Sequence, residues 1–290
     1  MFEGCFTALV TPFKKGKVDE ESLRKLVEFQ IENGVDGLVP CGTTGESATL
    51  THDEHNRVID IVIETSDGRV PIIAGTGSNS TSETIMLTNY GEKAGATAAL
   101  LISPYYNKPT QEGLFEHYKA VAKETSIPLI LYNVPGRTAV NMSPEIVARL
   151  SEIENIIGIK EATGNLEQVS NVIEYSKDDF IVLSGDDFAT YPMLAIGAKG
   201  VISVTSNIAP KDVSDMCRFF REGKFAEALK LHYKLQLLHR AMFVQTNPIP
   251  VKTALSMMEV MAEEFRLPLV SMADKDKAVI EITLKEYGLI

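Results

Sequence analysis

Short apolar runs alternate along the chain with longer segments in which apolar residues recur about every three to four positions. The runs are continuously apolar, which is typical of strands in a parallel sheet that helices cover on both faces. We predict eight strands, near residues 6–10, 37–40, 70–74, 98–102, 129–132, 156–160, 180–184 and 200–204. Eight strand–helix units in succession favour the α/β class and, within it, a closed (β/α)8 barrel.

Polar residues mark where the intervening helices begin and end, because free helix termini need side-chain partners. The signals are Asp19 and Gly34 around the first helix, Thr51 with Glu54 and Ser80 with Glu83 as capping boxes, and Ser143 followed by Pro144. A doubly wound open sheet is the alternative to a barrel. The segment 75–80 lacks the third glycine of a dinucleotide fingerprint, which favours the barrel.

From about residue 210 the strand pattern stops and helical patterns continue to the end. No Pro/Gly/Ser-rich linker separates this part from the rest. We therefore predict a catalytic barrel over residues 1–222 and a helical extension over residues 223–290 that packs on it.

Charge and composition narrow the class of partner. The 28 Lys and Arg residues against 39 Asp and Glu give a net charge of −11, which disfavours nucleic acid and anionic lipid as partners. No apolar run approaches the roughly 20 residues of a membrane-spanning helix, and the N-terminus does not resemble a secretory leader. The three cysteines, Cys5, Cys41 and Cys217, are too widely spaced to form a disulfide framework. We expect a cytoplasmic protein with reduced thiols.

Lys160 is the strongest candidate for chemistry. It ends an apolar strand, and barrel enzymes carry their reacting groups at the C-terminal ends of strands. Burial in apolar surroundings favours the neutral amine, which can attack a carbonyl carbon and form a Schiff base. The alternative is a buried ion pair with Glu161. Adjacent strand residues point to opposite faces, which makes that pair awkward and favours the nucleophile.

Other polar residues follow neighbouring strands at the same end. Tyr132 could act as a general acid and base, and the guanidinium of Arg137 suits a substrate carboxylate. The loop after the second strand carries Thr43 and Thr44 between glycines, where hydroxyls can bind a carboxylate or relay protons. The loop at 103–107 carries two adjacent tyrosines, which fit an interface or a catalytic role equally well.

Metal chemistry has little support in the sequence. His52 and His55 could share one helix face, but no third ligand is evident, and we interpret them as solvated helix residues. Asp186 and Asp187 follow the seventh strand and could hold a cation. We predict that no metal is required.

Four segments together resemble dihydrodipicolinate synthases, within the N-acetylneuraminate lyase superfamily, and the resemblance runs from Phe2 to about Leu267. The segments are Gly42–Leu50, Pro104–Asn107, Tyr132–Thr138 and Gly158–Asn165. The resemblance implies that pyruvate forms an imine with Lys160, becomes an enamine and attacks L-aspartate-4-semialdehyde. That reaction opens lysine and diaminopimelate biosynthesis and needs no cofactor beyond the covalent imine.

The resemblance also implies roles for the surrounding residues. Tyr132, Thr43 and Tyr106 would form the proton relay, with Tyr106 acting across a subunit boundary. A homodimer would then be the smallest complete enzyme, and a homotetramer is the usual form.

Substrate binding and regulation follow from the same resemblance. Thr44 and the Ile202 backbone would hold pyruvate, and Arg137 would receive the carboxylate of the semialdehyde. The positions that match an allosteric lysine site are polar or small here, so we expect inhibition by lysine. These positions are Ser47, Ala48, His52, His55, Asn79, Glu83 and Tyr105.

Two alternatives stay open at this point. Lys160 and Tyr132 are shared across the superfamily, so they also fit an N-acetylneuraminate lyase or a sugar-acid aldolase. Arg137 favours the synthase, since those enzymes lack a matching arginine. A non-catalytic 2-keto-acid sensor is the other alternative, but it would be expected to lose the relay hydroxyls that this chain retains.

Overall fold

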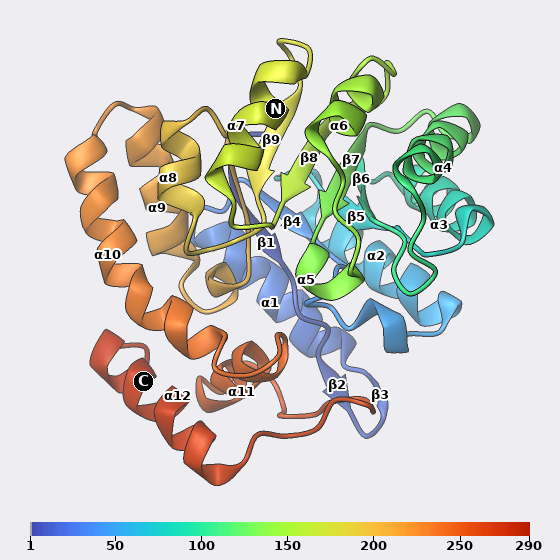
Figure 1. Ribbon diagram of the computed structural model, residues 1–290. Coiled ribbons are helices and arrows are strands. Elements are labelled where there is room, and N and C mark those ends of the chain that lie inside the picture. The colour runs from blue at the N-terminus through green and yellow to red at the C-terminus, as the bar shows by residue number, and fades with distance from the viewer. Residues whose placement is uncertain (1) are drawn as a thin grey trace. The chain divides into compact units, whose positions relative to one another are not determined.

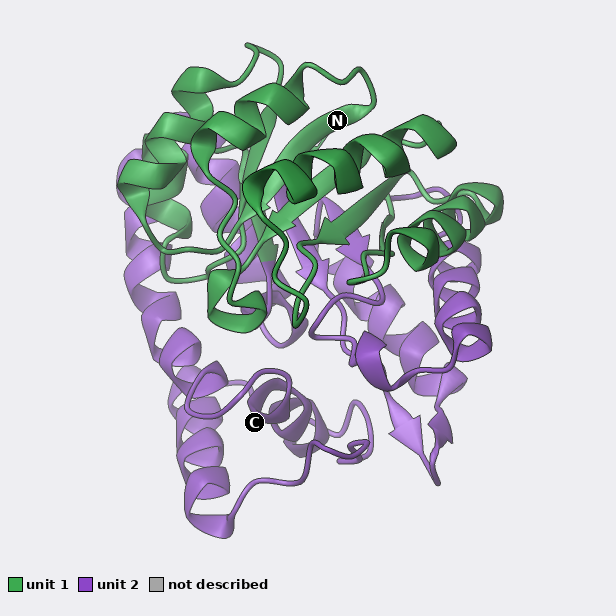
Figure 2. Cartoon of the chain, turned by 45° about the vertical axis from the view of Figure 1, so that its right-hand side comes forward, with its two compact units in different colours: residues 1–3, 71–202 green, residues 4–70, 203–290 purple. Residues whose placement is uncertain are grey.

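All eight predicted strands are present in the computed structural model, which describes residues 2–290 (Figure 1). Their bounds fall within a few residues of the predicted ones, and nearly every residue in them is buried, as the continuously apolar sequence requires. By internal contacts the chain divides into two units, which Figure 2 colours separately. The first comprises residues 1–3 and 71–202, and the second comprises residues 4–70 and 203–290.

The first unit is built on six parallel strands in the order β10-β9-β8-β7-β6-β5. The strands are β5 (Ile73–Gly75), β6 (Ala98–Ile102), β7 (Leu129–Asn133), β8 (Ile156–Glu161), β9 (Ile181–Ser184) and β10 (Gly200–Ser203), whose last residue falls in the second unit. The helices are α3 (Thr81–Ala94), α4 (Gln111–Glu124), α5 (Pro135–Thr138), α6 (Pro144–Ser151), α7 (Leu166–Tyr175) and α8 (Thr190–Ala195). Their apolar faces and the strands form one buried cluster that includes Leu131, Ile159 and Val169.

The second unit contains the remaining parallel pair, β1 (Gly4–Ala8) and β4 (Gly37–Val39). The structure adds an antiparallel hairpin that the pattern does not predict, β2 (Phe13–Lys14) and β3 (Lys17–Val18). The helical elements are α1 (Glu20–Glu32), η1 (Ser47–Thr49), α2 (His52–Ser66), η2 (Thr205–Asn207), α9 (Pro210–Arg221), α10 (Phe225–Met242), α11 (Ile249–Met257) and α12 (Asp274–Tyr287). Helix α10 packs against α9 and α12, and α11 also packs against α12.

Most of the helix-start signals act as predicted. The side chains of Asp19, Thr51, Ser80 and Ser143 each accept a hydrogen bond from the backbone N–H of the first turn that follows. Thr51 and Glu54 form the full capping box. At Ser80 the box is incomplete, because the backbone N–H of Ser80 donates to the hydroxyl of Ser78, which in turn bonds the Glu83 carboxylate.

The succession of elements confirms the predicted class: an α/β fold of the (β/α)8 barrel type with a C-terminal helical extension. The predicted boundary at residues 222 and 223 falls between α9 and α10, and the division into domains there stays a prediction. Within residues 2–290, no helix is both long and apolar enough to cross a membrane. Cys5, Cys41 and Cys217 are all buried, and none of them forms a disulfide within residues 2–290.

Candidate active site

Lys160 and Tyr132 are brought together at the C-terminal ends of β8 and β7. The two residues are register partners in the parallel ladder, so their side chains leave the sheet on the same face. The Nζ atom of Lys160 lies 4.1 Å from the centroid of the Tyr132 ring. Both side chains are buried, with 7% and 6% of their surface exposed. An amine and a phenol are thus held next to one another in a largely dry environment, which suits nucleophilic attack and proton transfer.

A glycine beyond β9 leaves room for the lysine side chain. A Cβ atom at Gly185 would lie 2.9 Å from Cε of Lys160 and 2.7 Å from Cβ of Ala162. Gly185 is tied to β8 by a 2.8 Å hydrogen bond from its N–H to the carbonyl of Glu161. Any larger residue at 185 would therefore push on the lysine or on the strand that carries it.

Glu161 faces away from Lys160, as strand geometry requires. Its carboxylate accepts hydrogen bonds from the side chains of Asn133 and Gln168 and from the backbone of Thr163. Within residues 2–290 the structure gives Glu161 no ion pair, so the alternative of a Lys160–Glu161 pair is not supported. Burial raises the pKa of Glu161, and the hydrogen bonds from Asn133 and Thr163 act in the opposite direction.

Arg137 and Ile202 also belong to the first unit. Arg137 lies exposed on the short helix α5. Ile202 is buried in β10, so a ligand could approach it through its backbone.

Thr43 and Thr44 lie in the second unit, on the turn that follows β4. Two left-handed residues, Cys41 at φ 57° and Glu46 at φ 52°, bracket this turn. The hydroxyl of Thr44 is buried and accepts a 3.0 Å hydrogen bond from the side chain of Asn247. The turn is thus fixed by side chains that come from the helical extension.

The strongest of these supports was not predicted. Lys252 on α11 donates a 2.5 Å hydrogen bond to the carboxylate of Glu46, and both side chains are 0% exposed. The ammonium also lies 4.2 Å from the centroid of the Phe13 ring. The sequence does contain a signal for this pair, because Lys252 stands in the apolar run 249–255 much as Lys160 stands in its strand.

The adjacent tyrosines in the first unit have different environments. Tyr106 is 90% exposed and adopts a left-handed conformation, with φ 69°. Tyr105 is half-buried, and burial together with the nearby Glu83 carboxylate raises its pKa. The carbonyl of Tyr105 accepts a hydrogen bond of 3.2 Å from the side chain of Asn79. Three of the seven positions expected to bind lysine, Asn79, Glu83 and Tyr105, are therefore neighbours in this unit.

The other four of those positions lie together in the second unit. Ser47 and Ala48 begin the 3-10 helix η1, and His52 and His55 lie in the first turn of α2. His52 is exposed, as expected for a solvated helix residue. The same expectation for His55 is wrong: its side chain is buried because it lies on the inner face of α2 together with Val58 and Ile59.

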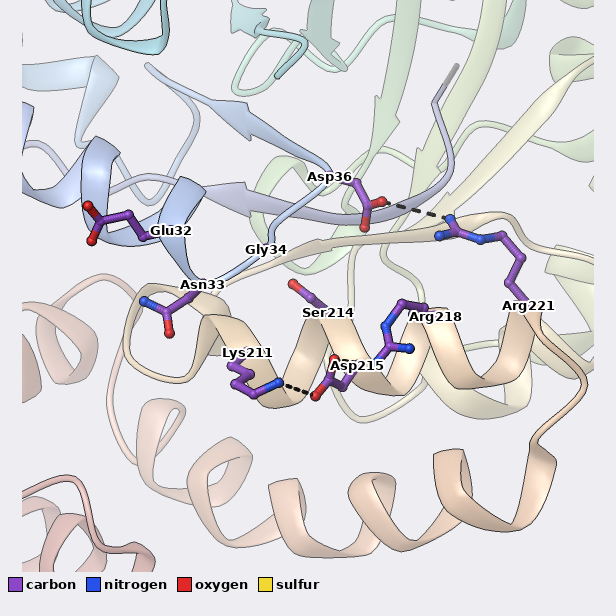
Figure 3. Close-up of a pocket in the computed structure, with 9 residues that line it drawn as sticks. All are labelled: Glu32, Asn33, Gly34, Asp36, Lys211, Ser214, Asp215, Arg218 and Arg221. Atoms are coloured by element: carbon purple, nitrogen blue, oxygen red, sulfur yellow. Dashed lines mark hydrogen bonds and ion pairs between the residues drawn. The ribbon is translucent and has the colours of Figure 1, made fainter. Parts of the chain in front are cut away.

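A separate cavity of about 340 Å³ lies in the second unit, between the end of α1 and the helix α9 (Figure 3). Its lining contains three cations, each within ion-pair distance of an acidic residue of the same lining. These pairs are Lys211–Asp215 at 2.7 Å, Arg218–Asp215 at 2.7 Å and Arg221–Asp36 at 3.8 Å. Asp36 precedes β4, so the cavity adjoins the N-terminal end of that strand, and it contains none of the predicted site residues.

The fold and the buried lysine–tyrosine pair define a class: barrel enzymes in which a strand-end lysine is placed to attack a carbonyl. Comparison with known proteins narrows the class. The dihydrodipicolinate synthetase family matches residues 1–287. The chain belongs to this family.

Individual relatives agree with the family match. The 4-hydroxy-tetrahydrodipicolinate synthase of Geotalea uraniireducens (strain Rf4) is 59% identical over 290 residues, which cover all of both chains. The structure of a chloride-inhibited dihydrodipicolinate synthase from Acinetobacter baumannii, complexed with pyruvate, is 47% identical, with a TM-score of 0.98 and full coverage of both chains. A dihydrodipicolinate synthase from Cyanidioschyzon merolae with lysine bound is 39% identical, with a TM-score of 0.96, and covers 100% of this chain and 99% of that chain.

These findings confirm the prediction of an enzyme of the lyase class with 4-hydroxy-tetrahydrodipicolinate synthase activity. They give no support to the alternatives of an N-acetylneuraminate lyase, a sugar-acid aldolase or a non-catalytic sensor.

Proposed function

We propose that Lys160 is the nucleophile that joins pyruvate to L-aspartate-4-semialdehyde in this chain. The observation that carries the proposal is the buried contact between the Lys160 amine and the Tyr132 ring at the strand ends. The amine adds to the C2 carbonyl of pyruvate, and loss of water gives an imine. The imine nitrogen acts as an electron sink, so a proton leaves C3 and an enamine forms.

The enamine completes the reaction in two further steps. Its C3 attacks the aldehyde carbon of the semialdehyde, which forms the new carbon–carbon bond and, after protonation, a hydroxyl. The amino group of the same substrate then attacks C2, closes the ring and displaces the Lys160 amine. The balance is one molecule of product and one of water from the two substrates, and no external cofactor is consumed.

The proton transfers in these steps need hydroxyl groups, and we assign them to Tyr132, Thr43 and Tyr106. Tyr132 is supported by its position beside Lys160. Thr43 is supported by its place on the turn after β4, and Tyr106 by its exposed position, from which it could serve a second subunit. Thr44 and the backbone of Ile202 would hold the pyruvate carboxylate.

Arg137 would bind the carboxylate of the semialdehyde and so select the second substrate. A guanidinium binds a carboxylate through two parallel hydrogen bonds, and the exposed position of Arg137 on α5 leaves it accessible. Turnover with aspartate semialdehyde should greatly exceed cleavage of N-acetylneuraminate, and Arg137→Ala should raise KM for the semialdehyde. Arg149→Ala, at a surface arginine of α6 paired with Glu112, is the matched control. Faster cleavage of the sugar acid, or an unchanged KM in Arg137→Ala, would contradict this assignment.

Lysine would act as a feedback inhibitor through the seven positions named above. The proposal is supported by the grouping of Asn79, Glu83 and Tyr105, and by the lysine bound in the relative from Cyanidioschyzon merolae. Glu83 offers a carboxylate for the side-chain ammonium. Activity should fall in millimolar L-lysine and stay constant in L-norleucine, which lacks that ammonium. Full activity in L-lysine, with no heat of binding in calorimetry, would remove the regulatory role.

The assembly would be at least a homodimer, because Tyr106 would serve the partner's site. Sedimentation velocity should show a dimer or tetramer at the concentrations used for assay. A fully active monomer would contradict the role of Tyr106 across a subunit boundary. The cytoplasmic location stays a prediction from the sequence.

A further inference from the structure

A polar cluster lies next to Lys160 and Tyr132 along the chain, on the opposite face of the same two strands. It consists of the side chains of Asn133, Glu161 and Gln168, which are buried, and of Asn141, which is exposed, and we call it the amide–carboxylate cluster. Asn133 directly follows Tyr132 at the end of β7, and Glu161 directly follows Lys160 at the end of β8. Strand alternation therefore places these two side chains behind the proposed catalytic pair.

Glu161 is the charged centre of the cluster, and its hydrogen-bond donors within residues 2–290 are all neutral groups. Its carboxylate accepts from the Thr163 backbone at 2.9 Å, from Asn133 Nδ2 at 3.1 Å and from Gln168 Nε2 at 3.2 Å. Only 1% of Glu161 is exposed. A carboxylate buried this deeply without a cation is costly, and an ionised carboxylate can only accept hydrogen bonds. The donors around it are therefore held in one arrangement.

The same cluster holds the segment 134–142, which carries Arg137, in place through hydrogen bonds. Asn141 Oδ1 accepts from Asn133 Nδ2 at 2.8 Å and from Gln168 Nε2 at 3.1 Å, while Asn141 Nδ2 donates to Gln168 Oε1 at 2.8 Å. The N–H of Met142 donates to Asn133 Oδ1 at 3.1 Å. The segment 134–142 leaves β7 at one end and is fixed to the cluster at the other.

The two proposed substrate-binding elements depend on the cluster to different degrees. Lys160 sits in a strand whose backbone is paired on both sides, with β7 and with β9. Arg137 sits on a helix of only four residues, α5, whose connection to α6 runs through Asn141. Loss of the cluster should displace the Arg137 segment well before it displaces the lysine.

We infer that Glu161 is a positioning residue that sets the place of Arg137, and hence the binding of the second substrate. This inference rests on the proposed function, in which Arg137 binds the semialdehyde carboxylate. It assigns to Glu161 a part in substrate selection that is separate from the imine chemistry of its neighbour.

The test is the variant Glu161→Gln, which keeps the size of the side chain. The NH2 group of the new amide would face N–H donors that now bond to a carboxylate oxygen. At least one of the present hydrogen bonds would be lost, and the two opposed donors would repel one another. We expect KM for aspartate semialdehyde to rise by about tenfold or more, since small displacements of positioning groups carry large effects. Trapping of pyruvate on Lys160 by borohydride should change by less than about threefold, because the barrier to imine formation does not involve Arg137.

Two further variants complete the design. Glu167→Gln makes the same chemical change at an exposed residue of α7 and should behave as the wild type. Asn141→Ala removes the side-chain hydrogen bonds between the segment and the cluster and leaves only those made by the backbone of Met142. It changes neither strand, and it should reproduce the rise in KM even if Glu161→Gln folds poorly. An unchanged KM in Asn141→Ala and in folded Glu161→Gln, or an equal loss of trapping and turnover in both, would overturn the inference. Failure of the proposed function is distinguishable, because then Arg137→Ala would leave the KM for aspartate semialdehyde unchanged, or borohydride would trap no pyruvate on Lys160 of the wild type.

Discussion

The buried pair of Lys252 and Glu46 offers a sharp test of how the helical extension supports the turn that bears Thr43 and Thr44. The two charged atoms are 2.5 Å apart, and neither side chain has any exposed surface. The variant Lys252→Met removes the cation and leaves an apolar side chain of similar length. Among residues 2–290, the Glu46 carboxylate would then keep one hydrogen-bond donor, the backbone N–H of Arg266 at 3.3 Å, and the charge of the Arg266 guanidinium would still act on it.

The expected loss of stability follows from these distances. At an effective dielectric constant of about 20, two unit charges 2.5 Å apart attract one another by roughly 7 kcal/mol. Desolvation of the two ions opposes this attraction by several kcal/mol for each ion. Burial accordingly lowers the pKa of Lys252 even though Glu46 acts to raise it. Removing the lysine alone leaves the buried Glu46 carboxylate without its paired cation. We therefore expect the free energy of unfolding to fall by about 3–5 kcal/mol.

Urea unfolding at pH 7, followed by circular dichroism, would measure that loss. The double variant Glu46→Gln with Lys252→Met removes both charges of the pair, and it should recover at least about 2 kcal/mol relative to Lys252→Met. Lys285→Met breaks an exposed pair on α12 and should change stability by no more than about 0.5 kcal/mol. A Lys252→Met protein within about 1 kcal/mol of the wild type would refute the reasoning.

Two other predictions follow from single contacts. Gly185→Ala would place a Cβ atom 2.9 Å from Cε of Lys160, so kcat/KM should fall by roughly 100-fold, whereas Gly91→Ala meets only ordinary contacts at 3.5 Å and should retain activity. Equal kinetics in the two glycine variants would contradict the steric role. Hydrogen bonds from Arg266 hold the pKa of Glu54 at about 2, below its ordinary 4.5. A lowered carboxyl pKa stabilises the fold above about pH 4.5, and this contribution is lost as pH falls toward 2. The stability advantage of the wild type over Glu54→Gln, measured by urea unfolding, should thus shrink between pH 6 and pH 2.5, and a constant difference would show that the carboxylate charge is not the cause.

The fold was predictable because each of the eight parallel strands is a largely apolar run and because α1, α2, α3 and α6 each begin at a recognisable capping residue. Lys160 and Tyr132 could be identified for the same reason, since a polar residue that ends such a run is conspicuous. Lys252 carries an equivalent signal, but its partner Glu46 lies 206 positions away, and no local pattern reveals such a pairing.

The amide–carboxylate cluster could not be predicted from local sequence patterns, for a different reason. Asn133, Asn141, Glu161 and Gln168 are ordinary polar residues in sequence. The register of β7 with β8 pairs Asn133 with Glu161, while Gln168 comes from α7 and Asn141 from the connection between α5 and α6. The prediction that His55 is solvated was wrong because the sequence around a helix start does not by itself show which face of the helix is buried.

The central claim is that Lys160 forms an imine with pyruvate. Borohydride reduction in the presence of pyruvate, followed by peptide mass mapping, tests it most directly. We predict a reduced pyruvyl adduct on the peptide that contains Lys160, and no adduct when Lys160→Ala is treated in the same way. An unmodified Lys160 in active wild-type enzyme, or an adduct that maps to another lysine, would contradict the account.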